Sequence, residues 1–230
     1  MNDATFTDPT AEPFERLRGL HERIRDDIIS GRLEPNQRLK VSDLATQYGT
    51  STNPVREALQ MLRGEGVVLI EPNRGARVRP IDENFVRDIT EIQMLIAPAL
   101  TRWFVSIVDT VDIRQLESVQ AEIEELNFAD LALHGRLDAK FHHVIYDRHY
   151  NRPAAELCER REILRAISRR FPASLSRRDA VIREHRELID RIRAQDAEGA
   201  AAVVAKHVEG GGLHLIEQMR AARRLSGTSG

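Results

Sequence analysis

The chain has 230 residues, more than the roughly 100–150 residues of a typical single domain, so its length predicts two domains. With 34 Lys and Arg residues against 36 Asp and Glu residues the formal net charge is −2, which disfavours nucleic-acid binding unless the charge is unevenly distributed. The single cysteine, Cys158, excludes an internal disulfide and is typical of a reducing compartment. No apolar run reaches about 18 residues, so we expect a cytoplasmic protein without a membrane span.

Residues 1–12 are polar and acidic and lack the basic and apolar regions of an export signal. We expect a flexible segment there, with the first helix beginning near Pro13. The next pattern is two short helices joined by a tight turn. Ser42 and Asp43 suit the N-cap and first-turn acid of the first helix, and Gly49 suits the turn.

The second helix of this pair is predicted from about Thr52, with Val55, Leu59 and Leu62 on its buried face. In helix-turn-helix geometry the N-terminal end of the second helix enters the major groove. The side chains at this end suit phosphates and base edges: Ser51, Thr52, Asn53 and Arg56.

A hairpin is predicted next, from the β-branched runs of VVLIEPNRGARV. Gly75 suits a residue with positive φ, and Arg74 at the tip is placed to contact phosphate or the minor groove. Between Arg32 and Arg79 eight Lys and Arg residues, including Lys40, face five acids, a local excess of three positive charges. Residues 13–80 are therefore expected to form a winged helix-turn-helix domain that binds double-stranded operator DNA. The alternative is a winged helix that binds protein.

This segment resembles the GntR family of transcription regulators. The likeness lies in IISGRLEPNQRL, in LATQYGTSTNPVREAL and in EGVV followed by NRGA. The family usually has Gly where Asn36 stands and Arg-Thr where Thr52 and Asn53 stand. The missing guanidinium at Thr52 predicts an altered operator preference, while Arg56 retains DNA binding.

Residues 81–225 are predicted to be helical almost throughout. Apolar residues recur at helical spacing, with helices expected over 85–105 and 113–126 and around 130–147, 154–170, 178–195 and 197–220. Several amphipathic helices with short connections favour an antiparallel bundle, and hence a mainly α chain. The arginine-rich stretch 159–178 has acids interleaved, and we interpret it as a solvated helix face. The run Gly210 to Gly212 predicts either a kink or a break in the last helix.

One group of residues in the predicted bundle suits a metal. Asp138 and His142 are four positions apart and project from the same side of one helix, while His185 and His207 lie on two other helices. Three imidazoles and one carboxylate that converge inside a bundle suit zinc or nickel. The alternative is that these histidines cap helices or form surface ion pairs. His143 is a weaker candidate than its neighbour His142, and we expect the other histidines to be surface or packing residues.

These helices resemble the FCD ligand-binding domain of FadR-type GntR regulators. Asp138, His142, His185 and His207 match the family's D-x-x-x-H, E-H and final His, and the resemblance implies a divalent metal that helps to hold a small effector. On its first bundle helix the family usually has an arginine, and a glutamate four residues later. This chain has Gln93 and Ala97 at those two positions. A neutral amide cannot form a charge-assisted fork with a carboxylate. We therefore expect a less acidic or more apolar effector, unless another arginine such as Arg102 lines the effector pocket.

Motifs of hydrolases and nucleotide-binding enzymes are missing from the sequence, so we do not expect an enzyme. A DNA-binding head followed by an effector pocket predicts a ligand-responsive homodimeric regulator, most simply a repressor, that binds a pseudo-palindromic operator. Two alternatives remain: a constitutive DNA-binding protein whose bundle only dimerises, and a metal-dependent hydrolase.

Overall fold

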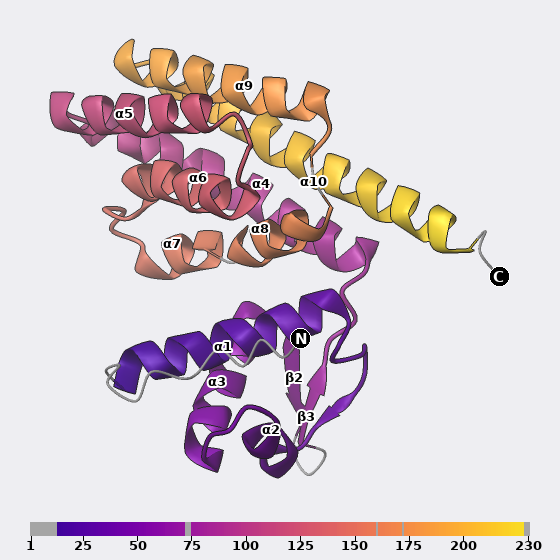
Figure 1. The fold of residues 1–230 in the computed structure, drawn as a ribbon. Helices are drawn as coiled ribbons and strands as arrows, with labels where there is room; N and C mark the ends of the chain where they lie inside the picture. Colours follow the sequence, from indigo (N-terminus) through magenta and orange to yellow (C-terminus); the bar gives the residue numbers. More distant parts are fainter. Residues whose placement is uncertain (1–12, 72–74, 160, 172, 228–230) are drawn as a thin grey trace. The chain divides into compact units, whose positions relative to one another are not determined.

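The computed structural model describes residues 13–71, 75–159, 161–171 and 173–227. The chain divides into two compact units, Met1–Ile81 and Asp82–Gly230, whose elements are drawn in Figure 1. The first unit contains the three strands found in the described residues, and the second is helical. The prediction of a mainly α chain is therefore confirmed.

The first unit packs three helices against a small sheet. Its helices are α1 (Pro13–Ser30), α2 (Val41–Gln47) and α3 (Thr52–Glu65). The antiparallel strands β1 (Arg38–Leu39), β2 (Val68–Glu71) and β3 (Gly75–Val78) are arranged in the order β1-β3-β2. Buried apolar side chains from all three helices and all three strands form the core, so α1 and the sheet hold the helix pair α2 and α3 in place.

The two short helices agree closely with the sequence pattern. Helix α3 begins at Thr52, and Val55, Leu59 and Leu62 are buried, as predicted. Gly49 has a φ of +65° in the turn between the helices. The assignment of Ser42 as the N-cap of α2 is wrong: Lys40 occupies the N-cap position, so the helix begins at Val41, two residues earlier than predicted.

The second unit is a bundle of helices (Figure 1). In chain order these are α4 (Glu83–Ile107), α5 (Thr110–Leu126), α6 (Leu131–Tyr146), α7 (Arg152–Glu159), α8 (Arg161–Arg170), α9 (Leu175–Arg193) and α10 (Ala197–Gly227). Aspartates start three of them: Asp82, Asp109 and Asp130 accept hydrogen bonds from first-turn backbone amides. The core includes the fully buried Phe104 and Phe141. No helix among the described segments is long and apolar enough to cross a membrane.

The region predicted as one helix over 154–170 contains α7 and α8, with position 160 between them outside the described residues. Helix α10 continues through Gly210, Gly211 and Gly212 without a break. A Cβ atom at Gly212 would lie 2.3 Å from the Thr90 Oγ1 atom. The glycine therefore allows α10 to pack tightly against α4.

Candidate functional site

The N-terminal end of α3 presents a row of polar side chains to solvent. Ser51, Thr52, Asn53 and Arg56 are all exposed. The Arg56 Nη1 atom donates to the Asn53 Oδ1 atom over 3.1 Å. Ser51 occupies the N-cap position but its side chain makes no capping hydrogen bond. The structure thus brings these four predicted residues together on one accessible helix end.

Two further predicted DNA-contacting residues, Lys40 and Gly75, lie at the ends of strands β1 and β3. Lys40 is exposed, with its Nζ atom 3.8 Å from Asp43 Oδ2. Gly75 has a φ of +78° at the start of β3, and a Cβ atom there would lie 3.9 Å from the Arg38 Nε atom. Arg74 lies outside the described residues. Arg38 is an exposed cation beside the hairpin that the sequence pattern did not single out; its only signal was the local excess of positive charge.

Four side chains of the bundle converge as the histidine and aspartate pattern predicted. Asp138 and His142 come from α6, His185 from α9 and His207 from α10. One ligand atom from each residue lies within 4.8 Å of the others. The Asp138 Oδ1 atom is 3.7 Å from the Nε2 atoms of both His142 and His185. Both of these histidines are fully buried, so the group is an interior cluster.

A second layer of polar side chains orients two of the imidazoles. The His185 Nδ1 atom is 3.0 Å from the Gln120 Oε1 atom, and the His207 Nδ1 atom is 3.0 Å from the Glu184 Oε2 atom. An oxygen acceptor at Nδ1 favours the tautomer with its proton on Nδ1, which leaves the Nε2 lone pair available. The sequence pattern did not identify Gln120 or Glu184.

Two arginines fix the carboxylates of this site. The Arg165 Nε atom donates to Asp138 Oδ2 over 2.7 Å, which leaves Oδ1 directed to the histidines. Arg177 donates from Nη1 to Glu184 Oε2 over 3.0 Å and from Nη2 to the His207 carbonyl oxygen over 2.9 Å. Burial opposes ionisation of Glu184, yet the hydrogen bond from His207 and the nearby positive charges hold its pKa below the usual value. The Glu184 carboxylate is therefore stabilised as an anion.

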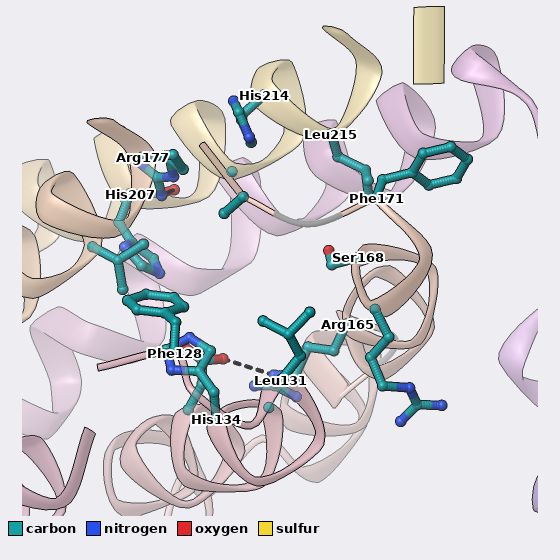
Figure 2. A pocket seen from close by; sticks show the side chains of 16 residues that line it. Phe128, Leu131, His134, Arg165, Ser168, Phe171, Arg177, His207, His214 and Leu215 are labelled. Atoms are coloured by element: carbon teal, nitrogen blue, oxygen red, sulfur yellow. Dashed lines mark hydrogen bonds and ion pairs between the residues drawn. The ribbon is translucent and has the colours of Figure 1, made fainter. Parts of the chain in front are cut away.

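Two neighbouring cavities open beside the cluster. The larger has a volume of about 190 Å³, and the smaller has a volume of about 120 Å³. Asp138, Arg165 and His207 line both. Figure 2 shows the larger cavity, with Arg165, His207, His134 and Phe128 around it. A small molecule in either cavity would lie against the metal-ligand residues.

Gln93 lies at the wall of the smaller cavity, as the effector-pocket hypothesis requires. Its side chain is buried, and its amide is already engaged. The Nε2 atom donates to the Leu157 carbonyl oxygen over 3.0 Å, and the Cys158 thiol donates to Oε1 over 3.2 Å. Gln93 therefore ties α4 to α7 as well as lining the cavity.

Arg102, the other predicted pocket residue, does not line either cavity. Nine positions separate it from Gln93, which is about two and a half helical turns and places the two on opposite sides of α4. Its Nε atom donates to Glu198 Oε1 over 2.8 Å at the surface. Three arginines line the larger cavity instead: the exposed Arg169, and Arg165 and Arg177, whose side chains are only 14% and 11% exposed. Arg165 and Arg177 are thus the two that are largely buried.

These two arginines belong to the stretch that we interpreted as a solvated face, so for them that interpretation is wrong. Two histidines that we expected outside the site, His134 and His214, also line the larger cavity. Burial lowers the pKa of both below the ordinary value of histidine. Neutral imidazoles therefore contribute to the wall of the cavity.

Comparisons with known proteins agree with both units. The profile described as "Bacterial regulatory proteins, gntR family" matches residues 18–78, and that of the FCD domain matches residues 88–210. The HTH-type transcriptional regulator YdhC of Bacillus subtilis (strain 168) is 24% identical over 94% of this chain and 96% of its own. The galactonate operon transcriptional repressor of Escherichia coli (strain K12) is 24% identical over 75% of this chain and 85% of its own. Among solved structures, E. coli McbR/YncC has the same fold, with a TM-score of 0.66 and 19% identity over 88% of this chain and 98% of its own.

Proposed function

Because the chain belongs to the GntR family of bacterial regulatory proteins and carries an FCD domain, we propose that it is a metal-containing, ligand-responsive regulator that binds its operator as a homodimer. The family and the named relatives are transcription regulators, which confirms the expectation that the chain is not an enzyme. One observation carries the proposal: four metal-ligand side chains converge beside a cavity in the FCD region.

The donor set fits a divalent transition metal such as zinc or nickel. Three imidazole nitrogens and one carboxylate oxygen are borderline ligands that suit these ions. Gln120 and Glu184 orient two imidazoles, and Arg165 orients the carboxylate, as the surroundings of metal ligands usually do. The four side chains would hold the ion, which would supply a Lewis-acidic centre for an oxygen of an effector. The chain's own residues line the cavity beside that position.

The exposed end of α3 supports DNA reading by major-groove contacts. Two protomers would place two such helix ends on the half-sites of a pseudo-palindromic operator. Repression is the direction that fits the relatives, since several of them, including the galactonate operon transcriptional repressor, are named repressors. An effector can change operator affinity only by as much as its own affinity differs between the DNA-binding and non-binding arrangements.

The proposal is tested with full-length protein purified without chelators. Elemental analysis should find about one divalent ion per chain, and selection from genomic DNA should return pseudo-palindromic fragments that bind two protomers. The affinity of the protein for such a fragment, measured by fluorescence anisotropy, should then change when some members of a panel of metabolites are added. The purified protein could instead contain no metal, with a DNA affinity that changes neither on chelation nor on addition of any metabolite of the panel. That result would favour the constitutive DNA-binding alternative and contradict the proposal.

A further inference from the structure

The exposed end of α3 lacks the arginine that the family usually carries there. Thr52 stands at that position, and its hydroxyl group offers a single donor where a guanidinium offers a planar fork of donors. Arg56 lies one helical turn further along, on the same exposed side of α3. A guanidinium is therefore still available to the groove, but from the second turn of the helix instead of from its first residue.

Asn53 holds this guanidinium in place. Its Oδ1 atom accepts a hydrogen bond of 3.1 Å from the Arg56 Nη1 atom, across one turn of the helix. In the part of the chain that the structure describes, no carboxylate forms an ion pair with Arg56. The partner is thus a neutral amide, which orients the guanidinium without cancelling its charge. A side chain that is oriented before binding loses less conformational freedom when it meets the DNA.

The hydrogen bond also decides what the pair can offer to a base. Asparagine reads adenine when its amide oxygen accepts from N6 and its amide nitrogen donates to N7. The oxygen of Asn53 is directed along the helix to Arg56, so this arrangement is not available while the pair is intact. The groups that remain, the Asn53 Nδ2 hydrogens and the other guanidinium hydrogens, are all donors. Guanine is the base whose major-groove edge presents two acceptors, N7 and O6.

Resting on the operator binding proposed above, we propose that Asn53 is a positioning residue that holds Arg56 for a guanine in each operator half-site. Arg56 donates to guanine N7 and O6 with the hydrogens that Asn53 leaves available. Asn53 acts through Arg56 and does not itself select adenine. The chain thus presents a held guanidinium at position 56 where the family usually has one at position 52.

Replacement of single atoms in the operator tests this assignment. The full-length protein first selects its operator from a library of random DNA duplexes. Each recurring guanine of the selected half-site is then replaced in turn by 7-deazaguanine, which keeps its base pairing and loses the N7 acceptor. At one of these positions the replacement should weaken binding of the unmodified protein about tenfold. The same replacement should leave the affinity of Arg56→Ala unchanged, since that variant has no guanidinium to lose its acceptor.

Variants at Asn53 separate positioning from direct reading. Asn53→Ala should reduce the 7-deazaguanine penalty to less than about threefold, because Arg56 is no longer held. Asn53→Asp should retain the penalty because a carboxylate oxygen still accepts from Arg56. The new charge weakens binding to every duplex, so the penalty and not the affinity is compared. The matched control is Gln60→Ala, which removes an exposed amide one turn beyond Arg56 and should retain the full penalty.

Binding to an unselected duplex shows whether the variants still fold and bind DNA. Its strength and salt dependence should be the same for Asn53→Ala and for the unmodified protein, since both keep the same charges. An unchanged 7-deazaguanine penalty in Asn53→Ala would overturn the positioning role. A recurring adenine whose 7-deaza analogue weakens binding of the unmodified protein but not of Asn53→Ala would also overturn it, because Asn53 would then read adenine directly.

These two outcomes would leave the regulator standing, since the protein would still bind its selected operator. Failure of the unmodified protein to select any sequence would instead contradict the proposed function itself.

Discussion

The two units of this protein assemble their binding surfaces in opposite ways. The residues of α3 predicted to contact DNA are near neighbours in the sequence, exposed, and attached to one helix. The proposed metal-ligand residues come from α6, α9 and α10, span positions 138 to 207, and are buried or half-buried. One surface needs only a correctly placed helix, whereas the other needs three helices to pack in register.

This difference has an energetic consequence. An exposed polar side chain already interacts with water, so its removal changes stability little. A buried imidazole or carboxylate costs free energy unless its partners are in place. Gln120, Glu184, Arg165 and Arg177 supply those partners in the bundle. Substitutions on α3 should therefore change DNA affinity alone, and substitutions in the cluster should change both ligand binding and stability.

The largest effect is expected in the cluster. His185→Ala should eliminate the bound ion, because the site loses one of four ligands that are fixed by their neighbours. When the free concentration of the ion is about a thousand times its Kd, ion binding adds about 4 kcal/mol to the free energy of unfolding. The variant should lose this stabilisation. Elemental analysis and thermal unfolding of the variant measure the two effects.

The matched control is His143→Ala. This histidine adjoins His142 on α6, but its side chain is 46% exposed and faces Asp147 at 3.8 Å. The control should retain the ion and the melting temperature of the unmodified protein. A His185→Ala protein that still holds one ion per chain would contradict the buried-ligand assignment.

The next effect concerns DNA. Arg56→Ala should weaken specific operator binding by about 1–3 kcal/mol, since it removes a guanidinium from the helix end that enters the groove. The melting temperature should hardly change because the side chain is exposed. Arg63→Ala is the control: it is exposed in the last turn of the same helix. Equal losses in both variants would indicate a general charge effect and contradict a specific role for Arg56.

The sequence predicted the first unit in detail because its signals are local. Helical periodicity identified the buried face of α3, and Gly49 marked the turn. The one boundary error, at Ser42, arose because Lys40 occupies the N-cap position and its side chain makes no capping hydrogen bond. Local composition carries no sign of such an N-cap.

The bundle site was predicted only in part. The i, i+4 spacing of Asp138 and His142 is visible in the sequence, His185 and His207 were selected as histidines on two further predicted helices, and the family resemblance matched all four. The roles of Arg165 and Arg177 were missed because a charged side chain in a basic stretch looks solvated until the opposing helix is known. Whether an arginine points to water or into a cavity depends on packing between distant helices, and that is not encoded in a local pattern.

The third prediction compares two adjacent glycines of α10. Gly212→Ala should lower stability by roughly 1–3 kcal/mol, because its Cβ atom would collide with the Thr90 side chain of α4. At Gly211 the nearest atom to an added Cβ is Arg177 Nη2 at 3.7 Å, an ordinary contact. Gly211→Ala should therefore raise stability by up to about 1 kcal/mol through helix propensity. Urea unfolding of both variants measures the difference in stability. Equal destabilisation by the two substitutions would show that the space around each added Cβ atom does not determine the change in stability.

The smallest effect is expected in the first unit, at Asn36. Its φ of +64° lies in the left-handed region, which explains why the family usually has glycine there. Asparagine tolerates this conformation better than most residues, and its backbone N–H still donates to the Val78 carbonyl oxygen over 3.0 Å. Asn36→Ala should cost about 1 kcal/mol of unfolding free energy, whereas Asn36→Gly should be neutral or stabilising by less than about 1 kcal/mol. Both substitutions remove the same amide, so only backbone strain separates them in chemical denaturation. Equal losses would instead assign the role of Asn36 to its side chain.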